Sequence, residues 1–212
     1  ANLRKQEGSY EDFYFNYGLD YDRRDSSYNA KKGYITSFFQ KLPVVSENNE
    51  ISNTLTYTTY KELNKSTEMV GRASLYLKAI NTFDSSDVRV SKRASVPYNR
   101  LRGFEKGKVG PVDNNDYVGG NYISSVNLSS SLPNLFQDLE NLDISLFLDA
   151  ANVWGVDYDS TIDEKSKIRS STGIALNLMT PVGPLSFSFA APLSKASSDK
   201  TETFRFNLGT TF

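Results

Sequence analysis

The side chains that most often perform covalent catalysis are poorly represented in this chain. It contains neither cysteine nor histidine, which excludes cysteine nucleophiles, thiolate or imidazole zinc sites and every Ser-His-Asp arrangement. Serine and aspartate are plentiful, but nothing in their spacing singles out a nucleophile with a base beside it. We therefore expect no catalytic residue, no metal and no cofactor, and an enzyme is the least supported class of function.

Charge and hydropathy narrow the remaining classes. The chain has 24 Lys+Arg against 25 Asp+Glu, so no overall field favours nucleic acid as a partner. No apolar run approaches the length of about 20 residues that a transmembrane helix needs. Residues 1–8 lack the apolar centre of a signal peptide, so we expect any export signal to lie upstream. The chain is either soluble or crosses a membrane as strands.

Alternation of apolar and polar residues with a period of two runs through almost the whole chain and predicts an all-β fold. The pattern is clearest in residues 142–149, where Leu and Ile occupy one face and mostly polar residues the other. It recurs in residues 184–190 and 204–212. About nine strands are predicted, at residues 10–22, 33–42, 51–62, 68–80, 121–131, 142–154, 169–180, 184–191 and 203–212.

The composition of the polar face distinguishes two kinds of β protein. A soluble sandwich also alternates, but its outer face usually carries Lys and Glu. Here the polar face is mainly Ser, Thr, Asn and Gly, which suits a crowded wet lumen, and the strands are long enough to cross a bilayer when tilted. We favour an antiparallel transmembrane β-barrel, with the sandwich as the alternative. Because barrels of this kind close with an even number of strands, we expect partner strands upstream of Ala1.

The connections between the strands alternate in length when they are followed back from the C-terminus. They are long at 194–201, tight at 181–183, long at 155–167, moderate at 132–141 and very long at 80–120. Extracellular loops and periplasmic turns alternate in this way in outer-membrane barrels. The pattern predicts a long extracellular loop at about 81–120 and a C-terminus on the periplasmic side.

A short motif in this loop, Leu101-Arg102-Gly103-Phe104, resembles the (V/I/L)-R-G-(F/Y) signature of the BamA family, also called the bacterial surface antigen family. Other elements of that pattern follow in order: Gly119-Gly120-Asn121, Phe147-x-Asp149, Val153-Trp154, Gly173-Ile174-Ala175-Leu176, Thr180-Pro181-x-Gly183-Pro184-Leu185 and the ending from Phe204 to Phe212. Asp22-x-Arg24-Asp25 with Lys32-Gly33-Tyr34 is similar to the family's turn upstream of the loop. The resemblance covers residues 1–212 and implies the C-terminal part, about nine strands, of one barrel of 16, with periplasmic POTRA domains upstream.

The resemblance also implies how the loop is held. In such proteins the loop folds into the barrel and its arginine contacts acidic residues of the lumen wall, which makes Arg102 the loop residue and Asp149 its best partner. A planar guanidinium holds a carboxylate through two hydrogen bonds and stays charged in a confined site. The alternative is that Arg102 lies in a solvated loop and Asp149 merely wets the lumen. The family commonly has an acidic residue on the strand after the loop, where this sequence offers Ser129.

The neighbours of these two charges have two interpretations each. Gly103 is either a tight turn that lets the loop tip enter the lumen or an ordinary loop glycine. Phe104 and Phe147 either pack together inside the barrel or fill the lumen separately.

The last strand resembles a recognition signal of outer-membrane barrels. Phe204, Phe206, Leu208 and Phe212 share one face and could equally be lipid-facing residues that end in an aromatic girdle. Gly209, on the opposite face, would allow a kink and either weakens a lateral seam with the first strand or relieves crowding.

The function implied by the resemblance is assembly: folding β-barrel proteins and inserting them into the bacterial outer membrane through a weak lateral seam. The expected partners are the lipid bilayer, unfolded outer-membrane client proteins and accessory lipoproteins of an assembly complex. The alternatives are a paralogous protein-secretion or translocation barrel and a passive pore, in which Lys106, Lys108 and Asp113 could form a charged constriction.

Overall fold

A computed structural model describes residue 6 and residues 8–27, 29–46, 49–84, 86–133, 142–165, 167–180 and 183–208. Strands dominate this part of the chain, as the alternation predicts, and the only helical segments in these ranges are two short 3-10 turns. The described part of the chain contains no helix that is both long and apolar enough to span a membrane.

Nine long strands form one sheet. They are β1 (Phe13–Asp22), β2 (Gly33–Val45), β3 (Glu50–Asn64), β4 (Met69–Thr82), β7 (Tyr122–Ser131), β8 (Leu142–Trp154), β9 (Arg169–Thr180), β10 (Gly183–Ser194) and β11 (Phe204–Leu208). Their spatial order, β1-β2-β3-β4-β7-β8-β9-β10-β11, is their order in the chain, and every neighbouring pair is antiparallel. The fold is therefore an up-and-down meander, which short local connections can build.

The predicted strands match the observed ones to within a few residues. Residues 142–154 and 169–180 agree at both ends, whereas the first strand begins at Phe13 rather than residue 10. The last predicted strand continues to residue 212, but residues 209–212 lie outside the described part of the chain. The sequence did not predict the small hairpin of β5 (Val112–Asp113) and β6 (Asp116–Tyr117) inside the long loop, nor the 3-10 turns η1 (Val90–Lys92) and η2 (Ser160–Ile162).

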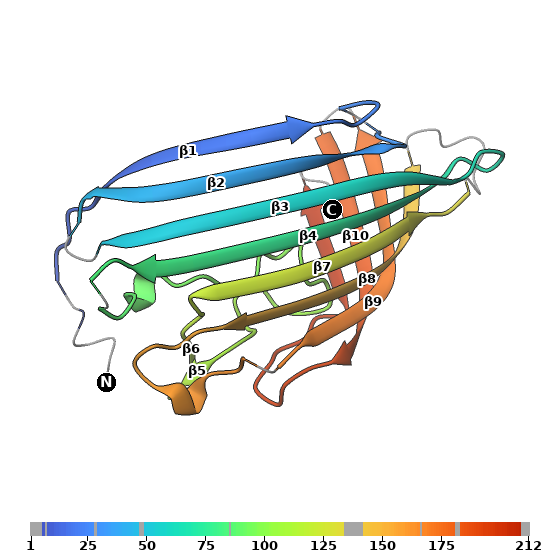
Figure 1. Ribbon diagram of the computed structural model, residues 1–212. Helices are drawn as coiled ribbons and strands as arrows, with labels where there is room; N and C mark the ends of the chain where they lie inside the picture. Colours follow the sequence, from blue (N-terminus) through green and yellow to red (C-terminus); the bar gives the residue numbers. More distant parts are fainter. Residues whose placement is uncertain are drawn as a thin grey trace.

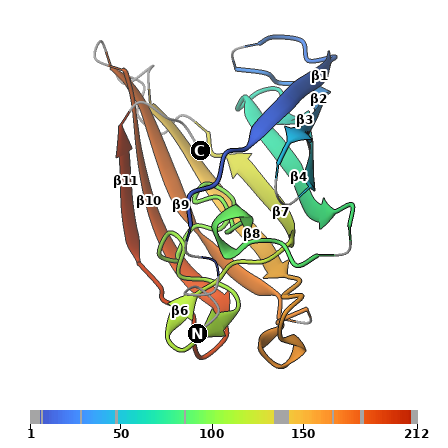
Figure 2. The same ribbon diagram turned by 90° about the vertical axis from the view of Figure 1, so that its left-hand side faces the viewer.

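The sheet is strongly curved, and the chain between β4 and β7 lies on its concave side. Figure 1 shows the nine strands side by side, and Figure 2 shows the loop, in green, enclosed by the two arms of the sheet. We call residues 83–121 the motif loop. The side of the sheet on which the strands end next to this loop is called the loop end. The opposite ends of the strands, where residues 65–68 join β3 to β4, form the turn end.

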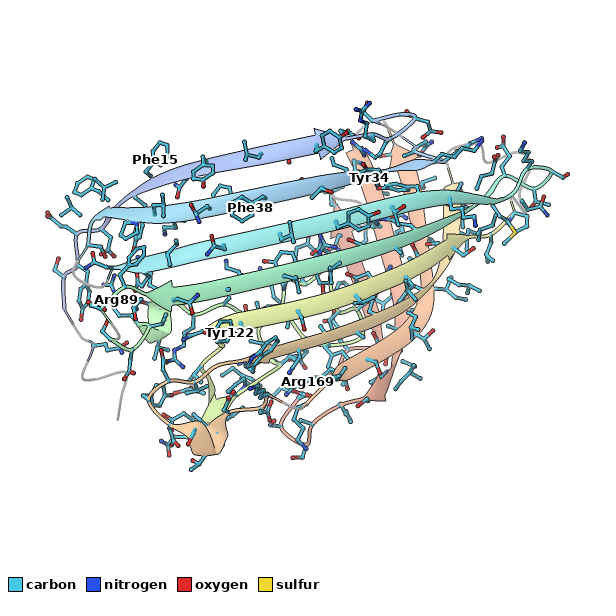
Figure 3. All side chains as sticks on the ribbon, in the orientation of Figure 1. Phe15, Tyr34, Phe38, Arg89, Tyr122 and Arg169 are labelled. Atoms are coloured by element: carbon cyan, nitrogen blue, oxygen red, sulfur yellow. The ribbon has the colours of Figure 1, made fainter. Side chains whose placement is uncertain are left out.

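The outer, convex face of the sheet is apolar and exposed. Directly opposed residues form rows across it, of which Leu146, Ile174, Phe189 and Phe204 make one, and all four side chains are exposed. Leu19, Phe38, Leu55 and Leu77 make another row across β1 to β4, and Figure 3 labels Phe38 together with Phe15 and Tyr34 of the same face. The described residues place no second sheet over these rows, so the sandwich alternative is wrong. The predicted apolar outer face of a membrane barrel is confirmed.

The concave face is polar toward the turn end and buried under the motif loop toward the loop end. Ten buried apolar residues form the main core there, and six of them belong to the loop itself: Ile80, Val88, Ala94, Val96, Leu101, Phe104, Val109, Ile123, Ala151 and Val153. This core lies between the loop and the sheet, rather than between two layers of regular structure. Burial of these side chains therefore fixes the loop against β4, β7 and β8.

The alternation of connection lengths holds only over the later strands. The long segments 83–121, 155–168 and 195–203 all leave the loop end, and residues 181–182 connect β9 to β10 at the turn end. Between the first three strands the pattern reverses, because residues 46–49 at the loop end are few and residues 23–32 at the turn end are more numerous.

Candidate functional site

Arg102 and Asp149 form a bidentate ion pair beneath the motif loop. Arg102 donates from Nε to one carboxylate oxygen of Asp149 and from Nη2 to the other, each at 2.8 Å, and its backbone N–H donates to the same carboxylate at 3.1 Å. Asp149 is 0% and Arg102 5% exposed. The contact that the resemblance implies is therefore present, and the solvated-loop alternative for Arg102 is wrong. A pair this buried is costly to break from one side only, since the remaining charge is left without compensation.

Phe147 supports the guanidinium from below. The Cζ atom of Arg102 lies 3.5 Å from the centroid of the Phe147 ring, which is the geometry of a cation–π contact. Phe147 and Asp149 are two residues apart on β8 and so point to the same face of the sheet. The Phe-x-Asp spacing thus supplies both a carboxylate and an aromatic platform for one guanidinium.

Gly173 makes room for that platform. A Cβ built at this residue of β9 would lie 2.0 Å from the backbone oxygen of Phe189 and 2.8 Å from Cζ of the Phe147 ring. Gly173 is the register partner of Phe147. Only glycine at this position lets the ring lie across the neighbouring strand without displacing it.

Gly103 forms the turn that follows the arginine. Its φ is +88°, and a Cβ there would lie 3.1 Å from Cβ of Ala190, so both the backbone and the space favour glycine. Its carbonyl accepts a hydrogen bond from the N–H of Glu202 at 3.1 Å. The tight-turn interpretation of Gly103 agrees with this geometry.

Phe104 and Phe147 do not pack together. Phe104 is 1% exposed and belongs to the main core beneath the loop, whereas Phe147 lies in a separate small cluster with Ala175 and Ala190. The backbone of Phe104 forms a bridge to Thr201. The two aromatic residues therefore act at different places, the first within the loop core and the second under Arg102.

Asn127, which the sequence did not single out, completes the environment of Asp149. Asn127 is the register partner of Asp149 on β7, while Ser129 is opposite Phe147. The Asn127 side-chain amide donates to Asp149 at 2.9 Å and to the carbonyl of Arg100 at 2.8 Å. In the described structure the strand after the loop thus contributes a neutral donor to the carboxylate, and Asp149 is the acidic partner of Arg102.

A second buried ion pair joins the loop end of β9 to the connection before β11. Arg169 donates from Nε and Nη2 to Asp199 at 2.9 and 3.0 Å, and both side chains are fully buried. Arg169 also contacts Asn152 and Glu164, and Asp199 accepts from the N–H of Ala196 at 2.6 Å. Figure 3 shows Arg169 near the loop end of the sheet. No local pattern marks this pair, because its members are held together only by the folded loops.

A third cluster holds the start of the motif loop near β1 and β3. Arg89 donates to Asp12 at 2.5 Å and lies 3.4 Å from Glu50, and Lys92 of η1 lies 2.8 Å from Asp12. Figure 3 labels Arg89 beside the end of β4. Hydrogen bonding by Lys92 is the main cause that lowers the pKa of the Asp12 carboxyl, with Ser46 and Arg89 contributing.

The residues considered for a pore constriction lie among loop side chains. Lys106 is exposed, Lys108 lies 5.0 Å from the centroid of the Tyr117 ring, and Asp113 accepts from the hydroxyl of Tyr158 at 3.2 Å. Burial, followed by the Asp113 carboxylate, raises the pKa of Tyr158 to about 12. Within the described ranges, no group of three or more metal-binding side chains was found.

The last strand exposes the face that the sequence predicts. Phe204, Phe206 and Leu208 are exposed on the outer side, opposite Phe189, Phe187 and Leu185 of β10. Gly209 and Phe212 lie outside the described residues. Within the described sheet β11 pairs only with β10, so the backbone groups of its other edge face away from the sheet.

Comparison with known proteins places this geometry in a family. The model described as the Omp85 superfamily domain matches residues 2–212. The outer membrane protein assembly factor BamA of Neisseria meningitidis is 32% identical over 139 residues, covering 53% of this chain and 17% of its own. The sorting assembly machinery 50 kDa subunit of Saccharomyces cerevisiae is 32% identical over 147 residues, covering 65% of this chain and 30% of its own.

A solved structure agrees with the fold over nearly all of the chain. The crystal structure of BamA from Haemophilus ducreyi lacking POTRA domains 1–3 superimposes with a TM-score of 0.84 at 28% identity, covering 92% of this chain and 41% of that one. The chain spans less than a third of the length of each of these two curated relatives. The nine-stranded sheet thus corresponds to part of an outer-membrane β-barrel.

Proposed function

Since the chain belongs to the Omp85 superfamily, whose barrels lie in the outer membrane, we propose that it forms part of a machine that folds β-barrel proteins and inserts them into that membrane. Two bacterial outer membrane protein assembly factors and the yeast sorting assembly machinery 50 kDa subunit are among its relatives. The observation that carries the proposal is the buried Arg102–Asp149 pair, which fastens the motif loop to the sheet wall.

This arrangement favours assembly over a passive pore. The loop fills the loop end of the concave face with a buried apolar core, which obstructs the route that a solute would take along the sheet. A diffusion pore gains nothing from burying an ion pair and ten apolar side chains in its passage.

The proposed mechanism is an exchange of hydrogen bonds, without covalent chemistry. β11 is the last strand of the described sheet, and a free strand edge offers a row of N–H and C=O groups to an incoming strand. A client strand that pairs there would enter the bilayer beside the apolar row of Phe204, Phe206 and Leu208. Accessory lipoproteins and POTRA domains remain predictions from the resemblance.

These 212 residues contain no cysteine, so cysteines introduced into this part of the barrel allow a direct crosslinking test. Single cysteines are placed at residues 204 to 208 of the complete protein in lipid vesicles, and an unfolded outer-membrane barrel with one cysteine in its terminal strand is added. We expect disulfides to β11 in a fixed register while the client inserts. Leu77→Cys on β4, an exposed outer residue of an inner strand, is the matched control and should not crosslink.

Three results would overturn the proposal. Insertion without any crosslink to β11 would remove the edge from the mechanism. Solute flux through the vesicles without insertion would support a pore, and export of one dedicated substrate would support a secretion barrel.

A further inference from the structure

Arg205 is the one charged residue of β11, and it faces the concave side between the outward-facing Phe204 and Phe206. Its side chain is 9% exposed. The guanidinium donates to the carbonyls of Tyr98 and Phe104 in the motif loop and to the carboxylate of Glu202. Three acceptors from two segments of the chain therefore converge on one side chain of the last strand.

The backbone joins the same two segments. The N–H of Glu105 donates to the carbonyl of Lys200 at 3.0 Å, and the N–H of Lys200 donates to the carbonyl of Lys108 at 3.0 Å. Together with the Glu202 to Gly103 bond, these contacts pair residues 103–108 with residues 200–202, directly before β11 begins. The segment that leads into the last strand is thus attached to the motif loop.

The connection continues to the sheet wall. Arg102, next to Gly103, is held by Asp149 of β8, and the hydroxyl of Ser171 on β9 donates to the Arg102 carbonyl. A continuous set of contacts therefore runs from β8 through the loop motif to β11, bypassing β10. Moving β11 away from the wall would therefore break the charged hydrogen bonds from Arg205 to the carbonyls of Tyr98 and Phe104.

We propose that Arg205 is a positioning residue that couples the last strand to the motif loop, so that the strand opens only when the loop is displaced. This inference rests on the proposed function, because it assigns a control point to the edge at which client strands would pair. Arginine suits the position because its fork has several donors in fixed directions, whereas lysine presents a single point charge. Lysine should therefore be a poor substitute.

Amide hydrogen exchange of the complete protein in lipid vesicles, without client, tests the coupling. In Arg205→Gln we expect exchange to rise at least about tenfold in both residues 204–206 and residues 103–108, which corresponds to a decrease of about 1.4 kcal/mol in the free energy of opening. Arg205→Lys should restore little of the protection. Lys195→Gln, which removes an exposed positive charge from the same connection, is the matched control and should exchange like the unmodified protein.

Asp149→Asn separates coupling from a purely local role. This change is on β8, so it should raise exchange in β11 only if the loop transmits the disturbance through Arg205. The Asp149→Asn, Arg205→Gln double variant should then show the same exchange in β11 as Arg205→Gln alone. If Arg205→Gln does not fold, the unmodified protein still decides the question, since the two segments should open together in correlated exchange. Independent opening, or a β11 unaffected by Asp149→Asn, would overturn the inference. The readout needs no client, so failure of the insertion assay would leave it intact.

Discussion

A single guanidinium determines where the motif loop meets the barrel wall. Arg102 uses its planar fork on both oxygens of Asp149, its backbone N–H on the same carboxylate and its face on Phe147. The contacts to the two carboxylate oxygens require a charged, forked donor, and the contact to the Phe147 ring requires a flat cation. Lysine would keep the charge and the backbone N–H, but it has neither the planar fork nor the flat face.

We predict that Arg102→Ala lowers the free energy of unfolding by about 3–5 kcal/mol, because it leaves Asp149 buried and uncompensated. Arg102→Lys should recover less than half of that loss. The measurement is urea unfolding in detergent micelles, followed by the loss of the compact band on unheated gels. Lys106→Ala, in the same loop but exposed, is the control, and a stability of Arg102→Ala equal to that of this control would disprove the role as a brace.

At the scale of the strand, the two faces have opposite requirements. On β9, Ile174 is exposed on the outer face within a row of apolar side chains, while Asn177 faces the concave side opposite Asp143. Residues three apart on one strand thus meet lipid in one case and the polar lumen in the other. The same alternation makes Gly173 possible beneath Phe147, since its missing side chain lies on the concave face.

We predict that Ile174→Arg destabilises the inserted barrel by about 2–4 kcal/mol, the range for a cation near the middle of the lipid face. Asn177→Arg should be tolerated, because the new cation faces Asp143. Yield of folded protein in vesicles and its urea midpoint measure the difference. Equal damage from both substitutions would contradict the assignment of the outer face to lipid.

Across the whole molecule, the motif loop is attached to the sheet at widely separated points. Arg89 joins it to Asp12 and Glu50 near the first strands, Arg102 to β8 and Arg205 to the last strand. The apolar core fills the space between these charged contacts. We therefore expect a loop attached in this way to move as a unit, rather than to fray at its tip.

The ion pairs of Asp12 with Arg89 and Lys92 near β1 should weaken at low pH and not at high pH. Because Lys92, Ser46 and Arg89 lower the folded-state pKa of Asp12 below its ordinary 3.8, the stabilisation is fully present above that value. It is lost as the pH falls through the folded-state pKa. Amide exchange of residues 88–93 should therefore be equally protected at pH 7 and pH 5, corrected for intrinsic rates.

Asp12→Asn should abolish that protection at both pH values, since it removes the charge that Lys92 and Arg89 bind. Asp116→Asn, an exposed change in the β5–β6 hairpin, is the control and should leave it unchanged. A loss of protection between pH 7 and pH 5 in the unmodified protein would mean that a group other than Asp12 holds this end of the loop.

The sequence by itself determined the two-faced strands, their approximate limits and the Arg102–Asp149 contact. The first two follow from a local period of two residues, which each strand carries in its own sequence. The third was implied by the resemblance to the BamA family, which residues 101–104 and 147–149 carry in order.

Only the tertiary structure decided which residues complete the site. Asn127 meets Asp149 because of the register between β7 and β8, and a shift of one residue would turn its side chain to the lipid face. Arg169 and Asp199 meet, and Arg205 reaches Tyr98 and Phe104, because loops distant in sequence fold onto one another. Such contacts leave no local periodicity, since packing of the whole loop against the sheet sets them.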